Sequence, residues 1–316
     1  MNLTIAYMTA RKEPKSEWFF ASLGRELEAN KDLPLPRIIV VDFYHSKERF
    51  PRGQGYCGEI INTNPKPCIW QGEHRLTREN WFAASNARNT ALCLAPDGWI
   101  VYVDDLSVLM PGWLKAVRDA MSGGYIALGA YKKVKNLVVE NGEVKSYEEF
   151  PGGIDSRWRH GDPNSPVDAA GSWMFGCSVA LPVEALLTIN GWPEDLCDGL
   201  SGEDYCCGIA LQNAGYKFKY DLRMLTLESE EHHHIEPAFR REDWHFENGV
   251  PKIGGNGADD KSHAALNIAR QSTYFQNSFG EGDIGALRQR TLMGFPFPIP
   301  SAPEHDWFTK LALKDL

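Results

Sequence analysis

The chain lacks the features that mark several common classes of protein. Its 316 residues contain no run of about 18 apolar residues, so we expect no transmembrane segment. Charged residues interrupt every apolar run among the first thirty residues, which argues against a signal peptide. The seven cysteines form no Cys-x-x-Cys pair and no regular framework, and an odd number fits reduced thiols. We therefore expect a cytoplasmic protein.

The chain has fewer basic than acidic residues, and it lacks two catalytic motifs. Lys and Arg number 33 against 42 Asp and Glu, and the net charge of −9 argues against a strongly basic nucleic-acid binder. A local basic groove remains compatible with this total. The chain has no His-Glu-x-x-His motif, which argues against a metal hydrolase. It also has no glycine between Thr9 and Lys15, where a nucleotidyltransferase would need a phosphate-binding loop.

The first half of the chain alternates between strand-like and helix-like segments. Leu3–Met8, Arg37–Val41 and Trp99–Val103 are apolar and strand-like. Helical spacing of apolar residues predicts one helix from Ser16 and another between Thr77 and Leu92. A helix beginning at Pro111 and a strand at 125–130 follow. This βαβ pattern predicts an α/β fold with a mostly parallel sheet flanked by helices.

The second half of the chain is more irregular. Asn141-Gly142 predicts the turn of a β-hairpin over 137–144. The remaining predictions are a surface loop at 151–166, strands at 174–181 and 222–227, a short helix from Pro182, a glycine-rich loop at 248–260, and a helix at 261–270. A Pro-rich segment follows at 295–303.

An acidic pair, Asp104-Asp105, ends the apolar strand Trp99–Val103. In open α/β sheets, ligands bind at the carboxyl ends of the strands. Two carboxylates at that edge can hold a divalent cation, which neutralises a diphosphate leaving group. Aspartate also ends strands and starts turns without any such role, and the spacing alone does not decide between the two readings.

A second acidic pair, Glu203-Asp204, begins a predicted helix after a loop rich in Gly and Trp at 190–202. Asp204 is a candidate general base for an acceptor hydroxyl, with Glu203 holding the acceptor. The structural alternative is that Ser201 and Asp204 form a capping box, because acids favour the first turn of any helix.

Three further groups are candidates for ligand contacts. His232, His233 and His234 can bind metal through neutral imidazole, and at most two of them face one site if the chain is extended. Arg88, on the helix before the acidic strand, can reach a phosphate or a base edge. Arg157 and Trp158 can form a sugar or acceptor platform. The alternatives are a solvated histidine run, a surface arginine and an ordinary loop.

Taken in order, these motifs resemble the family 2 glycosyltransferases of the GT-A fold, over about residues 1 to 235. The matching pieces are Thr9-Ala10-Arg11, Val40-Val41-Asp42, Ala87-Arg88-Asn89, Val103-Asp104-Asp105 with Pro111, Gly202-Glu203-Asp204, Ala214-Gly215-Tyr216 and the late histidines. The segment Asn190–Gly215 is also similar to a stretch of the β-1,4-galactosyltransferases.

The resemblance implies a nucleotide-sugar donor, most often UDP-linked, and a Mn²⁺ or Mg²⁺ cofactor. The metal would be held by Asp105 with one or two of the histidines. Asp204 would deprotonate the acceptor, whose in-line attack inverts the anomeric centre. The residues implied at the donor site are Thr9, Arg11, Asp42, Arg88 and Asp104, and those implied at the acceptor are Trp192, Arg157 and Trp158.

The resemblance also divides the chain. Residues 1–245 would form the GT-A catalytic domain, with a nucleotide-sugar half at 1–130 and an acceptor half at 131–245. Residues 246–316 would supply a lid loop and a C-terminal extension that packs on this domain. Two positions depart from the family pattern: Leu106 replaces a third acid after Asp105, and Phe43 replaces an acid that often reads the base.

The acceptor stays open between two classes. A glycan is usual for soluble bacterial relatives, whereas similar transferases of bacterial viruses modify 5-hydroxymethylpyrimidines in DNA. The second reading needs a basic path to the phosphates, for which the candidates are Arg157, Arg159, Arg240, Arg241, Lys252, Arg288 and Arg290. A non-catalytic glycan-binding module is a further alternative. The sequence predicts neither the sugar nor the oligomeric state.

Overall fold

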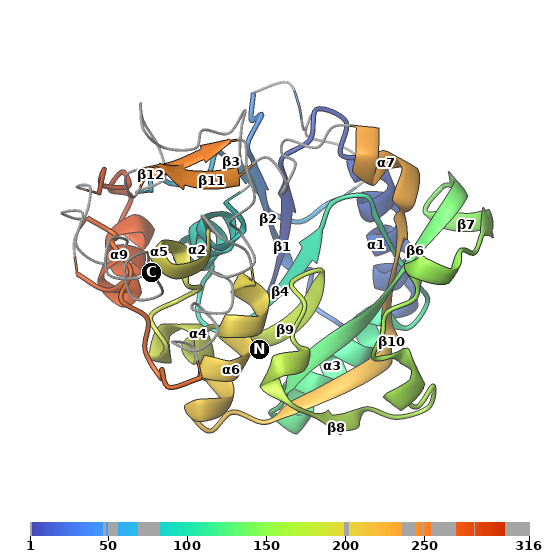
Figure 1. Ribbon diagram of the computed structural model, residues 1–316. Coiled ribbons are helices and arrows are strands. Elements are labelled where there is room, and N and C mark those ends of the chain that lie inside the picture. Colours follow the sequence, from blue (N-terminus) through green and yellow to red (C-terminus); the bar gives the residue numbers. More distant parts are fainter. Residues whose placement is uncertain are drawn as a thin grey trace.

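A ten-stranded sheet organises the molecule (Figure 1). The computed structural model describes residues 2–46, 49, 56–68, 83–198, 202–235, 244–247, 250–253, 270–280 and 282–300. The strands of the sheet are β1 (Leu3–Thr9), β2 (Arg37–Asp42), β3 (Ile60–Thr63), β4 (Trp99–Asp104), β5 (Ser107–Leu109), β6 (Ile126–Glu140), β7 (Glu143–Glu148), β8 (Val167–Ala169), β9 (Ser178–Pro182) and β10 (Phe218–Ser229). The helices are α1 (Ser16–Ala29), α2 (Ala84–Leu94), α3 (Trp113–Gly123), α4 (Val183–Thr188), α5 (Glu194–Cys197), α6 (Glu203–Asn213), α7 (Glu230–Ile235) and α9 (Ile284–Leu292).

The strand order is β3-β2-β1-β4-β9-β6-β10-β5, with β7 paired to β6 and β8 paired to β10. The predicted parallel arrangement holds for β3-β2-β1-β4. Beyond β4 the sheet is mixed, because β9 runs antiparallel to both β4 and β6, while β10 runs parallel to β6. The predicted α/β class is confirmed, and the mixed half carries the hairpin of β6 and β7.

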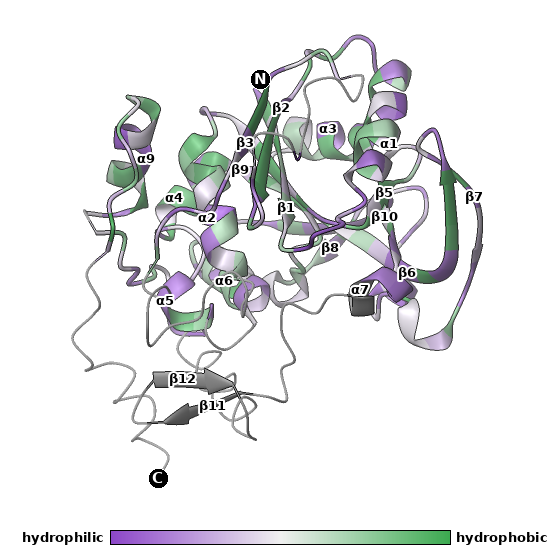
Figure 2. Ribbon diagram, turned by 90° about the horizontal axis from the view of Figure 1, so that it is seen from above, coloured by the Kyte–Doolittle hydropathy of each residue, from purple (hydrophilic) through white to green (hydrophobic). Residues whose placement is uncertain are grey.

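Helices cover both faces of the sheet (Figure 2). In β2, Ile38 and Val40 pack with α1 and α3 on one face, while Ile39 and Val41 pack with α2, α4, α6 and α9 on the other. All four side chains are fully buried. A strand covered on both faces needs continuous apolar sequence rather than alternation, which explains why these strands read as uninterrupted apolar runs.

The strand register places the polar residues that end β1, β2 and β4 at one edge. Thr9 pairs with Asp42, and Met8 pairs with Asp104. Because these three strands are parallel, their carboxyl ends meet at the same edge of the sheet. Thr9, Asp42 and Asp104 therefore lie close together at this edge.

Several predicted boundaries shift, and the causes are local. The helix expected from Pro111 begins at Trp113, because Gly112 adopts a φ of 94°. The Asn141-Gly142 turn is confirmed, with φ of 49° and 73°, the two positive values that a type I′ hairpin requires. A strand replaces part of the loop expected at 248–260, since β12 (Val250–Ile253) pairs with β11 (Trp244–Glu247). Thr77, Ser201 and the helix expected at 261–270, apart from Arg270, lie outside the described residues.

Segment 270–300 belongs to the main core. Phe275, Phe279, Ile284 and Leu287 are buried in the same cluster as α2 and α6. The Arg288 guanidinium donates to the Ala95 carbonyl, just beyond the C-terminal end of α2. Among the described helices, none is long and apolar enough to span a bilayer.

Candidate active site

The two adjacent aspartates at the end of β4 point to different places. Asp105 accepts a hydrogen bond from Thr9 Oγ1 at 2.7 Å and pairs with Arg11 Nε at 3.1 Å. Leu106 follows with a φ of 61° and is fully buried, a rare conformation for a residue with a bulky side chain. This turn lets Leu106 occupy the core, and it directs Asp105 toward β1 rather than toward the cavity that contains Asp104.

Asp42, at the end of β2, is also engaged. Its carboxylate accepts from the Tyr44 backbone N–H at 2.9 Å and lies 2.5 Å from Arg49 Nε. Burial raises the pKa of Asp42, which is fully buried, while the Tyr44 N–H and the Arg49 charge oppose that rise. Phe43, at the position where relatives often carry an acid, packs in the core with 4% exposure.

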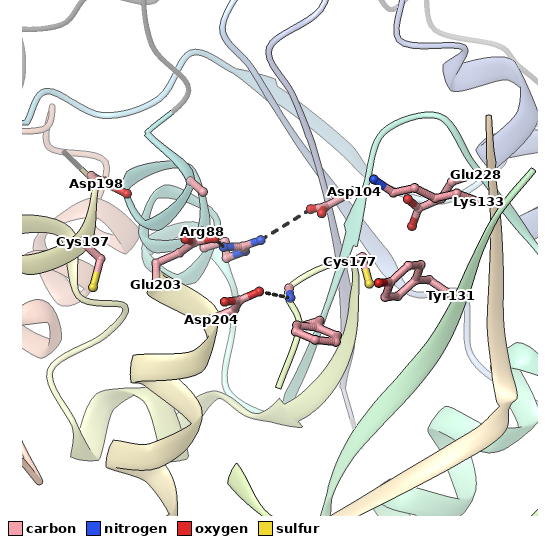
Figure 3. A pocket seen from close by; sticks show the side chains of 13 residues that line it. Arg88, Asp104, Tyr131, Lys133, Cys177, Cys197, Asp198, Glu203, Asp204 and Glu228 are labelled. Carbon is pink, nitrogen blue, oxygen red and sulfur yellow. Dashed lines mark hydrogen bonds and ion pairs between the residues drawn. The ribbon is translucent and has the colours of Figure 1, made fainter. Parts of the chain in front are cut away.

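A pocket of about 350 Å³ opens beside Asp104 (Figure 3). Residues of α2 and α6 form one side, and residues of β6 and β10 form the other. The lining consists of Ala84, Arg88, Asp104, Tyr131, Lys133, Phe175, Gly176, Cys177, Cys197, Asp198, Glu203, Asp204 and Glu228. The pocket therefore brings together the first acidic pair, through Asp104, and the whole of the second.

Arg88 connects the two acidic motifs. Its Nη1 donates to Glu203 Oε1 at 2.8 Å, and its Nη2 lies 3.6 Å from Asp104 Oδ1. The guanidinium rests on the Trp192 ring, with its carbon 4.6 Å from the ring centroid. With a side chain only 3% exposed, Arg88 is a buried brace rather than the surface residue of the structural alternative.

Gly176 leaves the space that this brace occupies. A Cβ at Gly176 would overlap the Arg88 guanidinium, and the Gly176 backbone N–H donates to Asp204 Oδ2 at 3.2 Å. The absence of a side chain at Gly176 thus lets one stretch of backbone contact both Arg88 and Asp204.

Replacing Gly176 by Ala should lower turnover by roughly tenfold to a hundredfold, because the displaced guanidinium would release Glu203 and Asp104. Steady-state kinetics with a matched thermal melt would measure the effect. Gly24→Ala is the control: a methyl group there meets nothing within 4 Å, and Ala in α1 should stabilise the fold by about 0.5 to 1 kcal/mol. Equal turnover of Gly176→Ala and wild type would show that the position of the Arg88 guanidinium does not matter for activity.

Asp204 has the electrostatics of a general base. Burial, together with the charge of Glu203, raises the pKa of Asp204 to about 7 against the opposing charge of Arg88. Its Oδ1 accepts from the Tyr205 N–H at 2.7 Å. A carboxyl with a pKa near the working pH can both accept a proton from a hydroxyl and release it again.

Asp104 presents the oxygen that best fits a cation. Its Oδ1 is buried and has no hydrogen-bond donor, although its side chain keeps 33% of its surface exposed. Burial raises the pKa of Asp104 to about 6, Glu228 adds to the rise, and Arg88 opposes it. In the described part of the chain, no three His, Cys, Asp or Glu side chains form a ready metal cluster. Asp104 Oδ1 accepts no hydrogen bond and lies 3.6 Å from Arg88 Nη2, whereas the predicted ligand Asp105 already accepts from Thr9 and pairs with Arg11, so Asp104 is the more available of the two for a divalent ion.

The late histidines lie on a helix rather than on an extended chain. Helix α7 begins at Glu230, so the predicted alternation of His232, His233 and His234 is wrong. His232 Nδ1 bonds to Ser229 Oγ at 2.7 Å, and its carbonyl accepts from Arg11 at 3.1 Å. Burial lowers the pKa of His232, which favours the neutral ring that binds metal. The side chains of His233 and His234 lie outside the described residues.

Two of the three residues predicted to contact the acceptor, Trp192 and Arg157, are buried, and none of the three lines the pocket. Trp192 is fully buried and meets Tyr102 edge to face, so it supports Arg88 and does not reach a bound acceptor. Arg157 is 5% exposed, pairs with Asp155 at 2.6 Å and lies 4.3 Å from the Phe175 ring centroid. Trp158 is partly buried against the core. These positions differ from the predicted acceptor platform because Trp192 is packed in the core and the Arg157 guanidinium is bonded to Asp155 and to the Gly129 carbonyl.

Sequence reasoning missed most of the other side of the pocket. Tyr131, Lys133 and Glu228 come from β6 and β10, which pair in register at Glu228 and Lys133. The alternation of Tyr131 and Lys133 along one strand was a usable signal, since both face the same way. The sequence showed Glu228 only as part of an acidic run and gave no sign that it lines a pocket. Phe175 and Gly176 precede β9 and carry no motif of their own.

Comparisons with known proteins bear on the fold. No protein-family model matches the sequence, and neither does any curated protein sequence. A crystal structure of GalNAc-T7 with UDP, GalNAc and Mn²⁺ aligns with 100% of this chain and 57% of that one, at a TM-score of 0.50 and 12% identity. The chain has the GT-A fold.

Two structures of residues 1–349 of S. aureus TarS also align. The complex with UDP covers 72% of this chain and 60% of that one, at a TM-score of 0.47 and 12% identity. The complex with UDP-GlcNAc covers 73% and 59%, at a TM-score of 0.47 and 13% identity. The chain spans no more than about 60% of the length of these three solved structures.

Proposed function

We propose that this chain is a glycosyltransferase that moves a sugar from a nucleotide-sugar to an acceptor hydroxyl, with inversion at the anomeric carbon. The observation that carries the proposal is the pocket at the carboxyl end of β4, with Asp104 at one point and Asp204, whose pKa is raised to about 7, at another. The GT-A fold supports it by analogy, since GalNAc-T7 of the same fold was solved with UDP and a sugar.

Each group of residues has its own role in the proposed reaction. Asp204 accepts the proton of the acceptor hydroxyl, whose oxygen then attacks the anomeric carbon of the donor. Glu203 is held by Arg88 at 2.8 Å, and its charge helps to raise the Asp204 pKa, while the Arg88 charge opposes that rise. Thr9, Arg11, Asp42 and Asp105 lie at the edge where the nucleotide would bind.

A divalent metal fits this site. Asp104 would hold it through the buried Oδ1 that accepts no hydrogen bond, and His232 is the histidine candidate whose side chain is described. When bound, Mn²⁺ or Mg²⁺ neutralises the diphosphate of the leaving nucleotide. Asp105 would join it only by giving up its contact with Arg11 or Thr9.

We favour a glycan acceptor over DNA. Of the residues proposed as a basic path for DNA, Arg157 and Arg288 are buried and bonded to Asp155 and Ala95. Arg240, Arg241 and the Lys252 side chain lie outside the described residues. A phosphate backbone needs exposed cations, and within the described part of the chain this set supplies Arg159 as an exposed cation, whereas Arg290 is partly buried.

Release of nucleoside diphosphate from a panel of UDP-, GDP- and TDP-sugars would test the function, run with Mn²⁺, with EDTA and with hydroxymethylated duplex DNA. We expect metal-dependent release from one donor, stimulated by glycan acceptors and unchanged by the DNA. Stimulation by DNA would move the acceptor to nucleic acid. No release from any donor, together with no binding of UDP, GDP or TDP by calorimetry, would overturn the proposal.

Activity should depend on pH through Asp204. The base must be ionised, so kcat/KM should fall about tenfold for each pH unit below the Asp204 pKa of about 7 and level off above it. Initial rates across this range would give the profile, with melting temperatures as a check that the fold persists. A descending limb that begins only near pH 4, the ordinary range of an aspartate, would contradict the raised pKa.

A further inference from the structure

Lys133 enters the pocket from the side opposite the second acidic pair. It lies on β6 next to Glu228 of β10, whereas Glu203 and Asp204 begin α6. Figure 3 shows the Lys133 side chain extending inward on the side of Asp104, with Asp204 across the pocket. The pocket thus has a candidate base on one side and a cation on the other.

The partners of Lys133 distinguish it from the other cation of the pocket. Arg88 is 3% exposed and already contacts Glu203, Asp104 and the Trp192 ring. The Lys133 side chain makes no hydrogen bond or ion pair with any described residue, even though the Lys133 backbone pairs with β10 at Glu228. The neighbouring Lys132, by contrast, is paired with Glu149 at the protein surface. A cation that enters a polar pocket without a protein partner is available to a ligand anion.

The position fits the geometry of an in-line displacement. The attacking hydroxyl approaches from the side of its base, so the leaving group must depart on the side away from Asp204. That side contains Asp104 and Lys133 (Figure 3). Charge that develops on a leaving diphosphate is best stabilised by a cation already in place.

We propose that Lys133 binds the diphosphate of the donor and stabilises it as the leaving group, an inference that rests on the proposed glycosyltransferase function. The acceptor oxygen forms a bond to the anomeric carbon as the bond from that carbon to the β-phosphate oxygen breaks. The bonding electron pair leaves with the diphosphate, and the hydroxyl proton passes to Asp204. Lys133 keeps its proton throughout and contributes charge alone.

Calorimetric binding of UDP, GDP and TDP to Lys133→Gln and to wild type would test this proposal, in Mg²⁺ and again in EDTA. Lys135→Gln is the matched control, because Lys135 lies on the same strand but is exposed and contacts the Phe150 ring outside the pocket. We expect Lys133→Gln to bind the diphosphate about tenfold more weakly while its affinity for the free nucleoside is unchanged. Lys133→Arg should restore most of the loss, and kcat should fall in Lys133→Gln but not in Lys135→Gln.

The outcomes separate this inference from the function on which it rests. Equal diphosphate affinity in Lys133→Gln and wild type would overturn the role of Lys133 and leave a transferase that uses other cations. If Lys133→Gln lowers kcat only when the acceptor is anionic, and leaves diphosphate affinity unchanged, Lys133 contacts the acceptor and the proposal is overturned. If wild type binds none of the nucleoside diphosphates, the proposed function fails and the inference fails with it. An equal loss of nucleoside and diphosphate binding would indicate a structural role and would also overturn it.

Discussion

Replacing Asp204 by Asn should lower kcat by about a thousandfold and leave binding of the nucleoside diphosphate nearly unchanged. General base catalysis by a positioned carboxylate contributes on the order of 10² to 10⁴ in rate. Asn has almost the same shape and can still accept from one of the Gly176 and Tyr205 N–H groups, which donate to separate oxygens of Asp204, but it cannot take up a proton. The pocket would keep its geometry while losing its base. Transfer rates and calorimetry on the same preparation would separate the two effects.

Asp195→Asn is the control for this result. Asp195 is the second acid of the other Glu-Asp pair, and it accepts from the backbone N–H and the hydroxyl of Ser278 instead of lining the pocket. Its substitution should change kcat by less than about threefold if the protein melts normally. Should Asp195→Asn lose transfer while Asp204→Asn retains it, the base would have been assigned to the wrong pair.

Replacing Glu194 by Gln should lower the free energy of unfolding by about 3 to 5 kcal/mol. Glu194 Oε2 pairs with Lys66 Nζ at 2.7 Å, and the two side chains are only 1% and 2% exposed. Burial alone would lower the pKa of Lys66, but the Glu194 charge keeps it raised. Without that charge, the folded chain must either bury an unpaired Lys66 ammonium group or keep the Lys66 amine neutral. Urea denaturation at constant pH would measure the loss.

Two further variants make this prediction specific. Asp32→Asn breaks an ion pair with Arg118 in which Asp32 is 73% exposed, and should leave the stability within about 0.5 kcal/mol of wild type. Removing both charges, as in Lys66→Met with Glu194→Leu, should recover much of the loss, because the cost of the single change comes from the uncompensated partner. A Glu194→Gln protein as stable as wild type would show that water reaches Lys66.

The sequence predicted the edge of the sheet better than the details of the site. Runs such as Trp99–Val103 are apolar because both sheet faces are covered, and an acid at their carboxyl end is readable from the chain. The sequence does not show which of the two adjacent acids faces the pocket, because successive side chains point to opposite sides. The unusual φ of Leu106 settles that choice, and propensity disfavours such a turn at leucine.

Most of the site features that the sequence did not predict depend on contacts between segments far apart in the chain. Arg88 and Glu203 are 115 positions apart, so no local pattern reveals that they are bonded. Arg88 was predicted to contact the donor, and its burial and its bond to Glu203 became visible only in the folded chain. Asp204 was found because its Gly-Glu-Asp motif is local, but its raised pKa comes from burial, which only the folded chain shows.

Helix α2, which carries Arg88, is held at both ends by segments that come much later in the chain. The Asp198 carboxylate accepts from the Ser85 and Asn86 N–H groups in its first turn, and Arg288 binds the Ala95 carbonyl beyond its last. Contacts spanning more than 100 residues form late during folding, since the loops that they close are long. During synthesis on the ribosome, the parallel half of the sheet would emerge well before the residues that fix α2. The catalytic geometry would therefore be assembled only once Arg288 has left the exit tunnel, and a nascent chain shorter than this would expose the apolar face of α2 to chaperones.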